Sequence, residues 1–240
     1  GMSAIMAVLV SLTRTGDHVV CAQGVFGTTQ QLFALFERYD IETSYVPLSD
    51  PEAWAAAIRP NTRMLFVETP SNPSTEVADL RALSEIARRH GIPLVVDNCF
   101  CTPALQRPLA LGADIVVHSA TKYLDGQGRV LGGAVLGGNQ YMNEKLQPVL
   151  RYCGPALSAF NAWMLAKGLE TLSIRMQRHS ENALAVARWL QAQPSVEKVR
   201  YPWLESHPQH ALARAQQDAG GAVLAFEMAG ADDAERRANA

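Results

Sequence analysis

The fold is decided by two neighbouring runs, Pro93-Leu-Val-Val-Asp97-Asn-Cys-Phe100 and Ala113-Asp-Ile-Val-Val-His118-Ser119-Ala-Thr121-Lys122. Each run contains a short apolar, β-branched segment, which is typical of a strand buried on both faces of a parallel sheet. Polar side chains follow each segment. Because ligands bind at the carboxyl edge of open α/β sheets, we expect Asp97 and Lys122 to lie together at a binding site.

An acid and a lysine at one sheet edge suit an aromatic aldehyde cofactor that carries a phosphate. The amine of Lys122 can bond the aldehyde, and the carboxylate of Asp97 can pair with a protonated ring nitrogen. The hydroxyls of Ser119 and Thr121, beside the lysine, can hold the phosphate. The simpler interpretation is that Asp97 caps a helix and Lys122 is a solvated surface residue, and the two residues taken singly favour it.

The residues around this acid and this lysine resemble the Cys/Met-metabolism family of pyridoxal-phosphate (PLP) enzymes. The similarity is carried by Val96-Asp97-Asn98-Cys99-Phe100-Cys101-Thr102-Pro103 and by Ser119-Ala-Thr121-Lys122-Tyr123, and it continues in collinear order along essentially the whole chain. The resemblance implies that Lys122 carries the cofactor and that Asp97 pairs with the pyridine nitrogen.

The resemblance also implies further cofactor contacts. Gly1 and Met2 match a turn whose backbone amides hold the phosphate at the start of a predicted helix. Phe26 stands where the family usually has a tyrosine that stacks on the ring; a phenylalanine can stack but cannot exchange protons, and packing under a loop is the alternative. Asn72 is expected beside the ring hydroxyl, with ordinary turn chemistry as the alternative.

Predicted strands and helices alternate along the chain, which predicts an α/β fold with a mainly parallel sheet and helices on both faces. One long helical stretch is predicted from Ser158 toward Leu190. The resemblance implies the aspartate-aminotransferase-like fold (fold type I), with a PLP-binding large domain at 1–173 and an incomplete, smaller C-terminal α/β domain at 174–240. We expect the chain to be a piece of a longer protein that has an N-terminal arm and a later arginine for the substrate carboxylate.

The composition is that of an ordinary globular chain. Its 240 residues are 48% hydrophobic and 18% charged, with a net charge of −2 and no basic face, so we expect no nucleic-acid partner. The apolar run at 4–12 is too short to cross a membrane. The four cysteines lack the spacing of metal ligands, which favours reduced thiols, no metal site and a cytoplasmic protein. The resemblance implies a homo-oligomer that is a dimer of dimers.

For the reaction, the resemblance implies replacement of the group on Cγ of an O-acylated homoserine. The resemblance at Gln127, which lies between two glycines, and at Phe26 implies O-succinylhomoserine as substrate and sulfide as sulfur donor, giving homocysteine and succinate. Synthesis or cleavage of cystathionine, or cleavage of methionine, is the alternative within the family, since those enzymes share the same residues.

Other classes of function fit the sequence less well. Ser119-Ala-Thr-Lys122 matches the Ser-x-x-Lys motif of serine acyl-enzymes, but it ends an apolar strand and the accompanying Ser-Asp-Asn and Lys-Thr-Gly motifs do not occur. The glycines at 126, 128 and 132 have the wrong spacing for a dinucleotide-binding fingerprint. A non-catalytic module that kept the fold and binds a partner is the remaining class.

Overall fold

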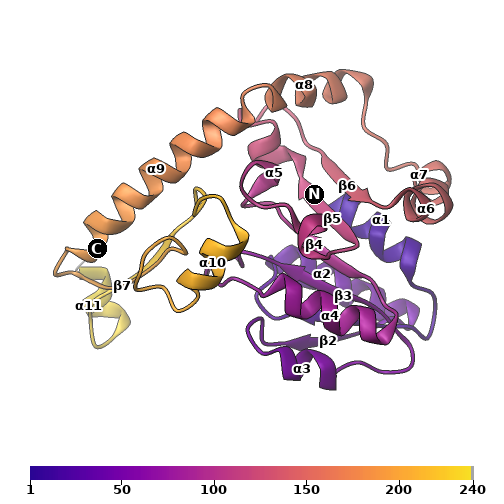
Figure 1. Cartoon of the computed structure of the whole chain (residues 1–240), viewed down its shortest axis with the longest axis horizontal. Coiled ribbons are helices and arrows are strands. Elements are labelled where there is room, and N and C mark those ends of the chain that lie inside the picture. Colours follow the sequence, from indigo (N-terminus) through magenta and orange to yellow (C-terminus); the bar gives the residue numbers. More distant parts are fainter. Residues whose placement is uncertain (239–240) are drawn as a thin grey trace.

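A six-stranded sheet forms the centre of the molecule (Figure 1), in a computed structural model that describes residues 1–238. The strand order is β2-β1-β3-β4-β5-β6, and all neighbours are parallel except β6, which is antiparallel to β5. The strands are β1 (His18–Ala22), β2 (Glu42–Val46), β3 (Thr62–Glu68), β4 (Leu94–Asp97), β5 (Ile115–Ser119) and β6 (Gly133–Gly137).

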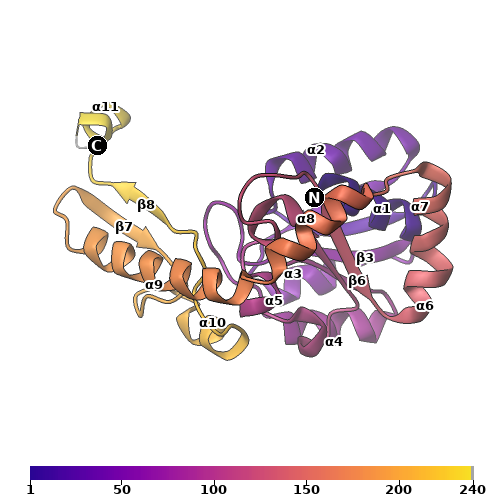
Figure 2. The same cartoon turned by 90° about the horizontal axis from the view of Figure 1, so that it is seen from above.

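Helices cover both faces of this sheet, as the alternating pattern predicts. Figure 2 shows α1 and α2 on one side and α4 on the other. The predicted fold class, a mainly parallel α/β sheet with helices on both faces, is therefore confirmed. The helices and helical turns of this part are α1 (Met2–Leu12), α2 (Gly27–Phe36), η1 (Glu37–Tyr39), α3 (Pro51–Ala56), α4 (Leu80–His90), α5 (Thr102–Leu105), η2 (Pro108–Leu111) and η3 (Ala120–Leu124).

The helix α4 forms at residues 80–90 because both of its ends are chemically specified. The Asp79 carboxylate accepts a hydrogen bond from the backbone N–H of Ala82, which satisfies one of the unpaired donors of the first turn. Gly91 ends the helix with φ of 66°, a left-handed conformation that glycine adopts without steric cost. The apolar face between these ends packs into the core beneath the sheet.

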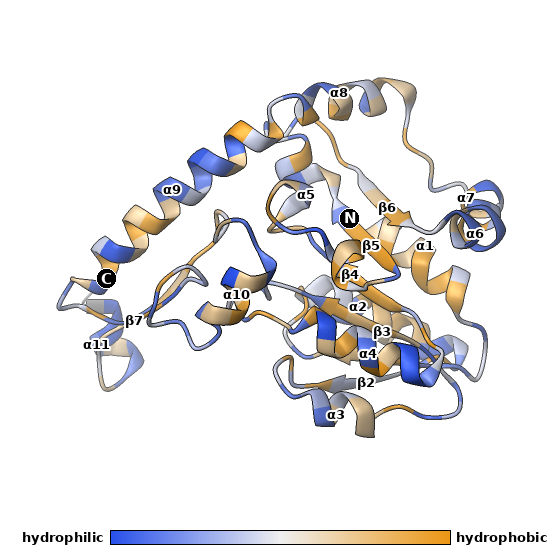
Figure 3. Ribbon diagram, viewed as in Figure 1, coloured by the Kyte–Doolittle hydropathy of each residue, from blue (hydrophilic) through white to orange (hydrophobic). Residues whose placement is uncertain are grey.

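The core lies between the helices and the sheet. All five residues of β1 and all four of β4 are buried, and the central strands are hydrophobic in Figure 3. A strand that is buried on both faces cannot carry a polar side chain in its middle without a partner. Polar residues therefore gather at the strand ends, where β4 stops at Asp97 and β5 at Ser119.

After β6 the chain departs from the predicted course in two places. Residues 139–153 form an unpredicted group of short helices, α6 (Asn139–Tyr141), η4 (Met142–Leu146) and α7 (Gln147–Cys153). The long helical stretch is divided into α8 (Ala159–Leu169) and α9 (Leu172–Gln191), because the helix breaks at Glu170 and Thr171. The expected domain boundary at 173/174 falls inside α9.

The last part of the chain forms a smaller α/β unit at the far end of α9 (Figure 1). Its two strands are antiparallel. Its own apolar cluster includes Ala187, Val199 and Tyr201. Residues 239 and 240 of the predicted C-terminal domain lie outside the described residues. The elements are β7 (Val196–Arg200), α10 (His210–Gln216), β8 (Ala225–Met228) and α11 (Asp233–Ala238).

The smaller unit is joined to the sheet by buried amide contacts. The Gln216 side chain accepts from the backbone N–H of Leu80 and donates to the carbonyl of Ala78, both at 2.9 Å. The carbonyl oxygen of the Gln209 side chain accepts from the N–H of Val77 at 3.0 Å. These bonds hold the loop that follows β3.

None of the helices within residues 1–238 has the length and apolar character needed to cross a membrane.

We predict that His118 makes the stability of this sheet depend on pH. Burial on β5 lowers the pKa of His118 to about 4, although a hydrogen bond to the Asn98 backbone opposes the shift. Since the unfolded chain binds the proton more readily, the contribution is complete above about pH 6.5 and is lost as the pH falls through about 4. The free energy of unfolding should fall by about 2 kcal/mol between pH 7.5 and pH 5 from this group alone.

Denaturant unfolding of the wild type and of His118→Gln across this pH range measures the effect. The variant should lose less stability than the wild type as the pH falls. Equal pH slopes for the two proteins would contradict the assignment to His118.

Candidate active site

All of the site residues predicted from the sequence line one cavity of about 1250 Å³ at the carboxyl edge of the sheet. They come from separate parts of the chain, namely the start of α1, the loop before α2, the loop after β3, and the ends of β4 and β5. The cavity is lined by Gly1, Met2, Phe26, Asn72, Asp97, Ser119, Thr121 and Lys122. The structure thus brings these residues together.

Asp97 is the last residue of β4 and is 7% exposed. Burial raises the pKa of its carboxyl above the ordinary value, and the backbone N–H of Cys99, which donates to Oδ1 at 3.1 Å, partly opposes this. Within residues 1–238 no salt bridge reaches Asp97. A buried carboxylate without an ion-pair partner attracts either a proton or a cationic ligand.

Lys122 lies in the turn η3, three residues beyond the end of β5. Its backbone leaves the helical conformation, with φ of −86° and ψ of −118°, and its side chain is exposed to the cavity. Arg175 at the start of α9 holds this turn, because its guanidinium donates at 2.8 Å both to the carbonyl of Tyr123 and to that of Gly168. The amine is therefore presented by a turn that is fixed from outside the sheet.

The start of α1 and Ser119 form another side of the cavity. A Cβ at Gly1 would lie 3.0 Å from the Ser119 Oγ, so the helix begins directly against this hydroxyl. The Gly1 nitrogen donates at 2.6 Å to the carbonyl of Gly132, so the N–H groups of Met2 and Ser3, the first in this 11-residue helix, are the ones that can attract an anion. This arrangement can hold a phosphate.

The hydroxyl of Thr121 has backbone partners in this structure. It donates to the carbonyl of Gly132 at 3.2 Å and accepts from the N–H of Gly132 at 3.0 Å. Thr121 lines the cavity, but these bonds tie η3 to the residue before β6. Its side chain therefore supports the lysine turn more directly than it supports phosphate binding.

Phe26 and Asn72 come from loops that contact each other. The N–H of Asn72 donates to the carbonyl of Gly24 at 3.3 Å, which joins the loop after β3 to the loop before α2. Phe26 is 46% exposed, and it lines the cavity. An apolar ring at a cavity wall has a free face on which a planar ligand can stack.

Glu68 is a site residue that was not predicted from the sequence. Glu68 ends β3, is 4% exposed and lines the same cavity. Its Oε2 accepts a hydrogen bond from the N–H of Phe26 at 2.7 Å. The signal was present, because Met64-Leu-Phe-Val-Glu68 is a buried strand that ends in an acid, as Leu94-Val-Val-Asp97 is.

The chemistry of these groups fits PLP. The buried Asp97 can neutralise a protonated ring nitrogen, and the amine of Lys122 can bond an aldehyde. The N-terminus of α1, together with Ser119, can bind a phosphate. The cavity is also large enough for a cofactor and a small substrate, since ligand pockets usually have volumes of about 300–1,000 Å³.

Residues 1–239 match the model of a protein family described as "Cys/Met metabolism PLP-dependent enzyme". The chain belongs to this family. The predicted family is thus confirmed, and with it the dependence of the family on PLP. The match covers both the sheet with its cavity and the smaller C-terminal unit.

Three named enzymes are similar to this protein over nearly its whole chain. An O-succinylhomoserine sulfhydrylase of Pseudomonas aeruginosa is 57% identical over 238 residues, which are 99% of this chain and 59% of that protein. The enzyme of the same name from Mycobacterium tuberculosis is 44% identical over 95% of this chain and 56% of its own length. An L-methionine gamma-lyase of Pseudomonas putida is 43% identical over 99% of this chain. The chain therefore spans about 60% of the length of these relatives.

Solved structures agree with the fold. The crystal structure of metB from Corynebacterium glutamicum superposes with a TM-score of 0.93 at 38% identity, over 95% of this chain and 60% of that one. The cystathionine gamma-lyase of Lactobacillus plantarum, complexed with L-serine, gives a TM-score of 0.92 at 35% identity. These similarities place the described chain in the fold of its family.

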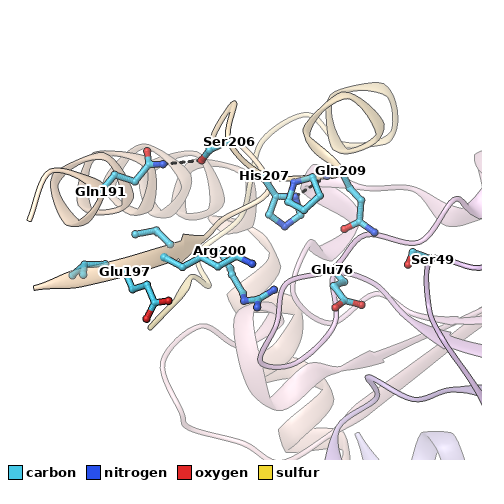
Figure 4. Close-up of a pocket in the computed structure, with 12 residues that line it drawn as sticks. Ser49, Glu76, Gln191, Glu197, Arg200, Ser206, His207 and Gln209 are labelled. Carbon is cyan, nitrogen blue, oxygen red and sulfur yellow. Dashed lines mark hydrogen bonds between the residues drawn. The ribbon is translucent and has the colours of Figure 1, made fainter. Parts of the chain in front are cut away.

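A second cavity, of about 450 Å³, lies between the smaller unit and the loops of the sheet (Figure 4). None of the predicted site residues lines it. Several of its polar groups already have partners. Gln191 donates to Ser206, and His207 accepts from the N–H of Gln209, while Arg200 pairs with Glu227 outside the cavity. The second cavity is therefore a polar contact region between the smaller unit and the loops of the sheet.

We predict that Gly168 is required for the position of the lysine turn. A Cβ at this residue of α8 would meet the carbonyl oxygen of Leu124 and lie 2.7 Å from that of Asp125, so η3 would have to move. Gly168→Ala should lower the free energy of unfolding by about 1–3 kcal/mol, the usual cost of overpacking. Thermal unfolding measures this loss. Gly138→Ala is the matched control, because a Cβ there meets nothing within 4 Å, and equal losses in the two variants would refute the prediction.

Proposed function

We propose that the full-length protein catalyses a PLP-dependent γ-replacement in methionine biosynthesis. O-succinylhomoserine and sulfide would give homocysteine and succinate: a carbon–sulfur bond forms at Cγ, and the bond from Cγ to the ester oxygen breaks. The observation that carries the proposal is the cavity that unites Lys122 with Asp97, in a chain 57% identical to an O-succinylhomoserine sulfhydrylase.

The proposed roles of the site residues follow from where they lie. Lys122 would hold the cofactor, and Asp97 would face the ring nitrogen. The amides of Gly1 and Met2, with Ser119, would bind the phosphate, while Phe26 would cover the ring and Asn72 would lie beside its hydroxyl. For Thr121 we propose support of the turn as well as a place at the phosphate, because its hydroxyl bonds the backbone of Gly132.

Bound PLP would supply an electron acceptor for the bonds at Cα and Cβ of the amino acid. Lys122 would take protons from these carbons and return them, and its place on a braced turn would keep the amine near both. The Asp97 carboxylate would stabilise positive charge on the ring nitrogen. Phe26 has no phenol, so any proton transfer must fall to other groups.

The alternative within the family is elimination, or the use of cysteine in place of sulfide. It is favoured by the 43% identity to an L-methionine gamma-lyase and to a probable cystathionine gamma-synthase of Herpetosiphon aurantiacus. The residues that line the cavity do not identify the sulfur donor by their chemistry. The sulfhydrylase is preferred because of the higher identity to relatives of that name.

We also propose a cytoplasmic homotetramer with a PLP-binding domain at 1–173 and a C-terminal domain beginning at 174. Separate apolar clusters in the sheet and in the smaller unit support the division. The four free cysteines support a reducing compartment. Exposed aromatic side chains support assembly, namely Tyr152, Phe160 and Trp163.

An assay of the full-length protein with different sulfur donors tests the proposed reaction. With O-succinylhomoserine, kcat/KM should be higher for sulfide than for cysteine, and homocysteine and succinate should appear in equal amounts. Higher kcat/KM with cysteine, or release of a thiol from methionine without a donor, would favour the alternative.

Lys122→Ala tests the role of the lysine. The variant should lose the visible absorbance of covalently attached PLP, and turnover should fall by at least about a hundredfold, because one group holds the cofactor and moves the protons. Borohydride treatment of the wild type should attach the cofactor permanently to the peptide that contains residue 122, as mass spectrometry would detect. Lys145→Ala, at an exposed lysine of η4, is the matched control. Attachment at another lysine would remove Lys122 from this role.

A further inference from the structure

Glu68 and Asp97 are neighbouring carboxyl groups at the same edge of the sheet. Glu68 ends β3 and Asp97 ends β4, and the two residues are directly paired in the register of these parallel strands. Side chains at paired positions of adjacent strands point to the same face of the sheet. Both residues line the cavity, and both are buried.

The carboxyl of Glu68 is held in place by the loop before α2. Its Oε2 accepts the N–H of Phe26 at 2.7 Å, and Phe26 is the residue from which α2 begins. The first turn of α2 thus takes its position from an acid at the end of β3. Glu68 therefore connects the aromatic wall of the cavity to the acid proposed to face the cofactor ring.

The groups around Glu68 do not supply enough positive charge to balance the ionised carboxylates of both Glu68 and Asp97. Its titratable neighbours are Asp97 on β4, Cys99 just beyond β4, and Cys21 on β1. Lys122 lines the same cavity, the Gly1 amine acts on Asp97 rather than on Glu68, and within residues 1–238 no salt bridge reaches Glu68 or Asp97. Burial raises the pKa of Glu68, and the charge of Asp97 raises it further. A protonated ring nitrogen brings one positive charge, which balances one carboxylate.

We propose that Glu68 is a positioning residue of the cofactor site and works as a neutral carboxylic acid. Its carbonyl oxygen holds the Phe26 backbone, and its retained proton leaves Asp97 as the one carboxylate beside the ring nitrogen. The inference rests on the proposed PLP function and adds a residue to that site. Two buried carboxylates side by side would repel each other, and the proton removes this repulsion.

The variant Glu68→Gln tests the protonation state, since an amide is neutral and keeps the oxygen that accepts from Phe26. PLP dissociation constants, measured by absorbance titration of the full-length protein, should stay within about threefold of the wild type for Glu68→Gln. Glu68→Ala leaves the Phe26 N–H without a partner and should bind PLP about tenfold more weakly, which corresponds to about 1.4 kcal/mol. Glu85→Gln, on the exposed side of α4, is the matched control.

Infrared difference spectra of the PLP-loaded protein give a second readout. The wild type should show the C=O stretch of a protonated carboxylic acid that disappears in Glu68→Gln and persists in Glu85→Gln. Weak PLP binding by Glu68→Gln, equal to that of Glu68→Ala, would show that Glu68 works as an anion and overturn the inference. Wild-type affinity in Glu68→Ala would overturn the positioning role. Failure of the wild type to bind PLP at Lys122 would instead refute the proposed function.

Discussion

The structure depends on the burial of a parallel sheet between two layers of helices. Val95, Val96, Val116 and Val117 are inaccessible or nearly so, so the middle of each central strand contains no group that could bind a polar ligand. Polar side chains are concentrated toward the ends of the strands. Since parallel strands end at the same edge, residues that are far apart in the chain meet there, and the cavity is the result.

The second constraint is the distribution of charge in that cavity. Asp97 and Glu68 are buried without salt bridges in the described chain, while the amine of Lys122 is exposed to the cavity. Two buried carboxyl groups in the same cavity as an amine destabilise the folded protein when no ligand is bound. A ligand that supplies positive charge and an electrophilic carbon removes this cost. The helix N-terminus at Met2 adds a site for negative charge at another side. The cavity is thus complementary to a ligand with separated charges.

Much of this could be predicted from residue patterns. The caps of α4, the strands that end at Asp97 and Ser119, and the turn of Lys122 follow local rules of capping, burial and β-branching. Other features depend on contacts between distant residues. The helices at 139–153 were not predicted, although Gly154 ends the last of them in a left-handed conformation, and Glu170 and Thr171 break a stretch whose apolar spacing continues on both sides. The role of the Thr121 hydroxyl depends on Gly132, whose backbone it meets only after β6 has paired with β5.

By itself, the sequence determined the class of fold, the family and the eight predicted site residues that line the cavity, but not Glu68, because only the first three follow from the order of strands and helices and from local motifs. Only the tertiary structure decided which groups share one environment. Glu68 and Asp97 are 29 positions apart in the printed sequence, and the pairing of β3 with β4 makes them neighbours. The bracing of the lysine turn by Arg175 likewise requires α9 to return across η3. The burial and the charge of a site residue depend on its contacts with several helices and strands. A short stretch of sequence therefore does not reveal them.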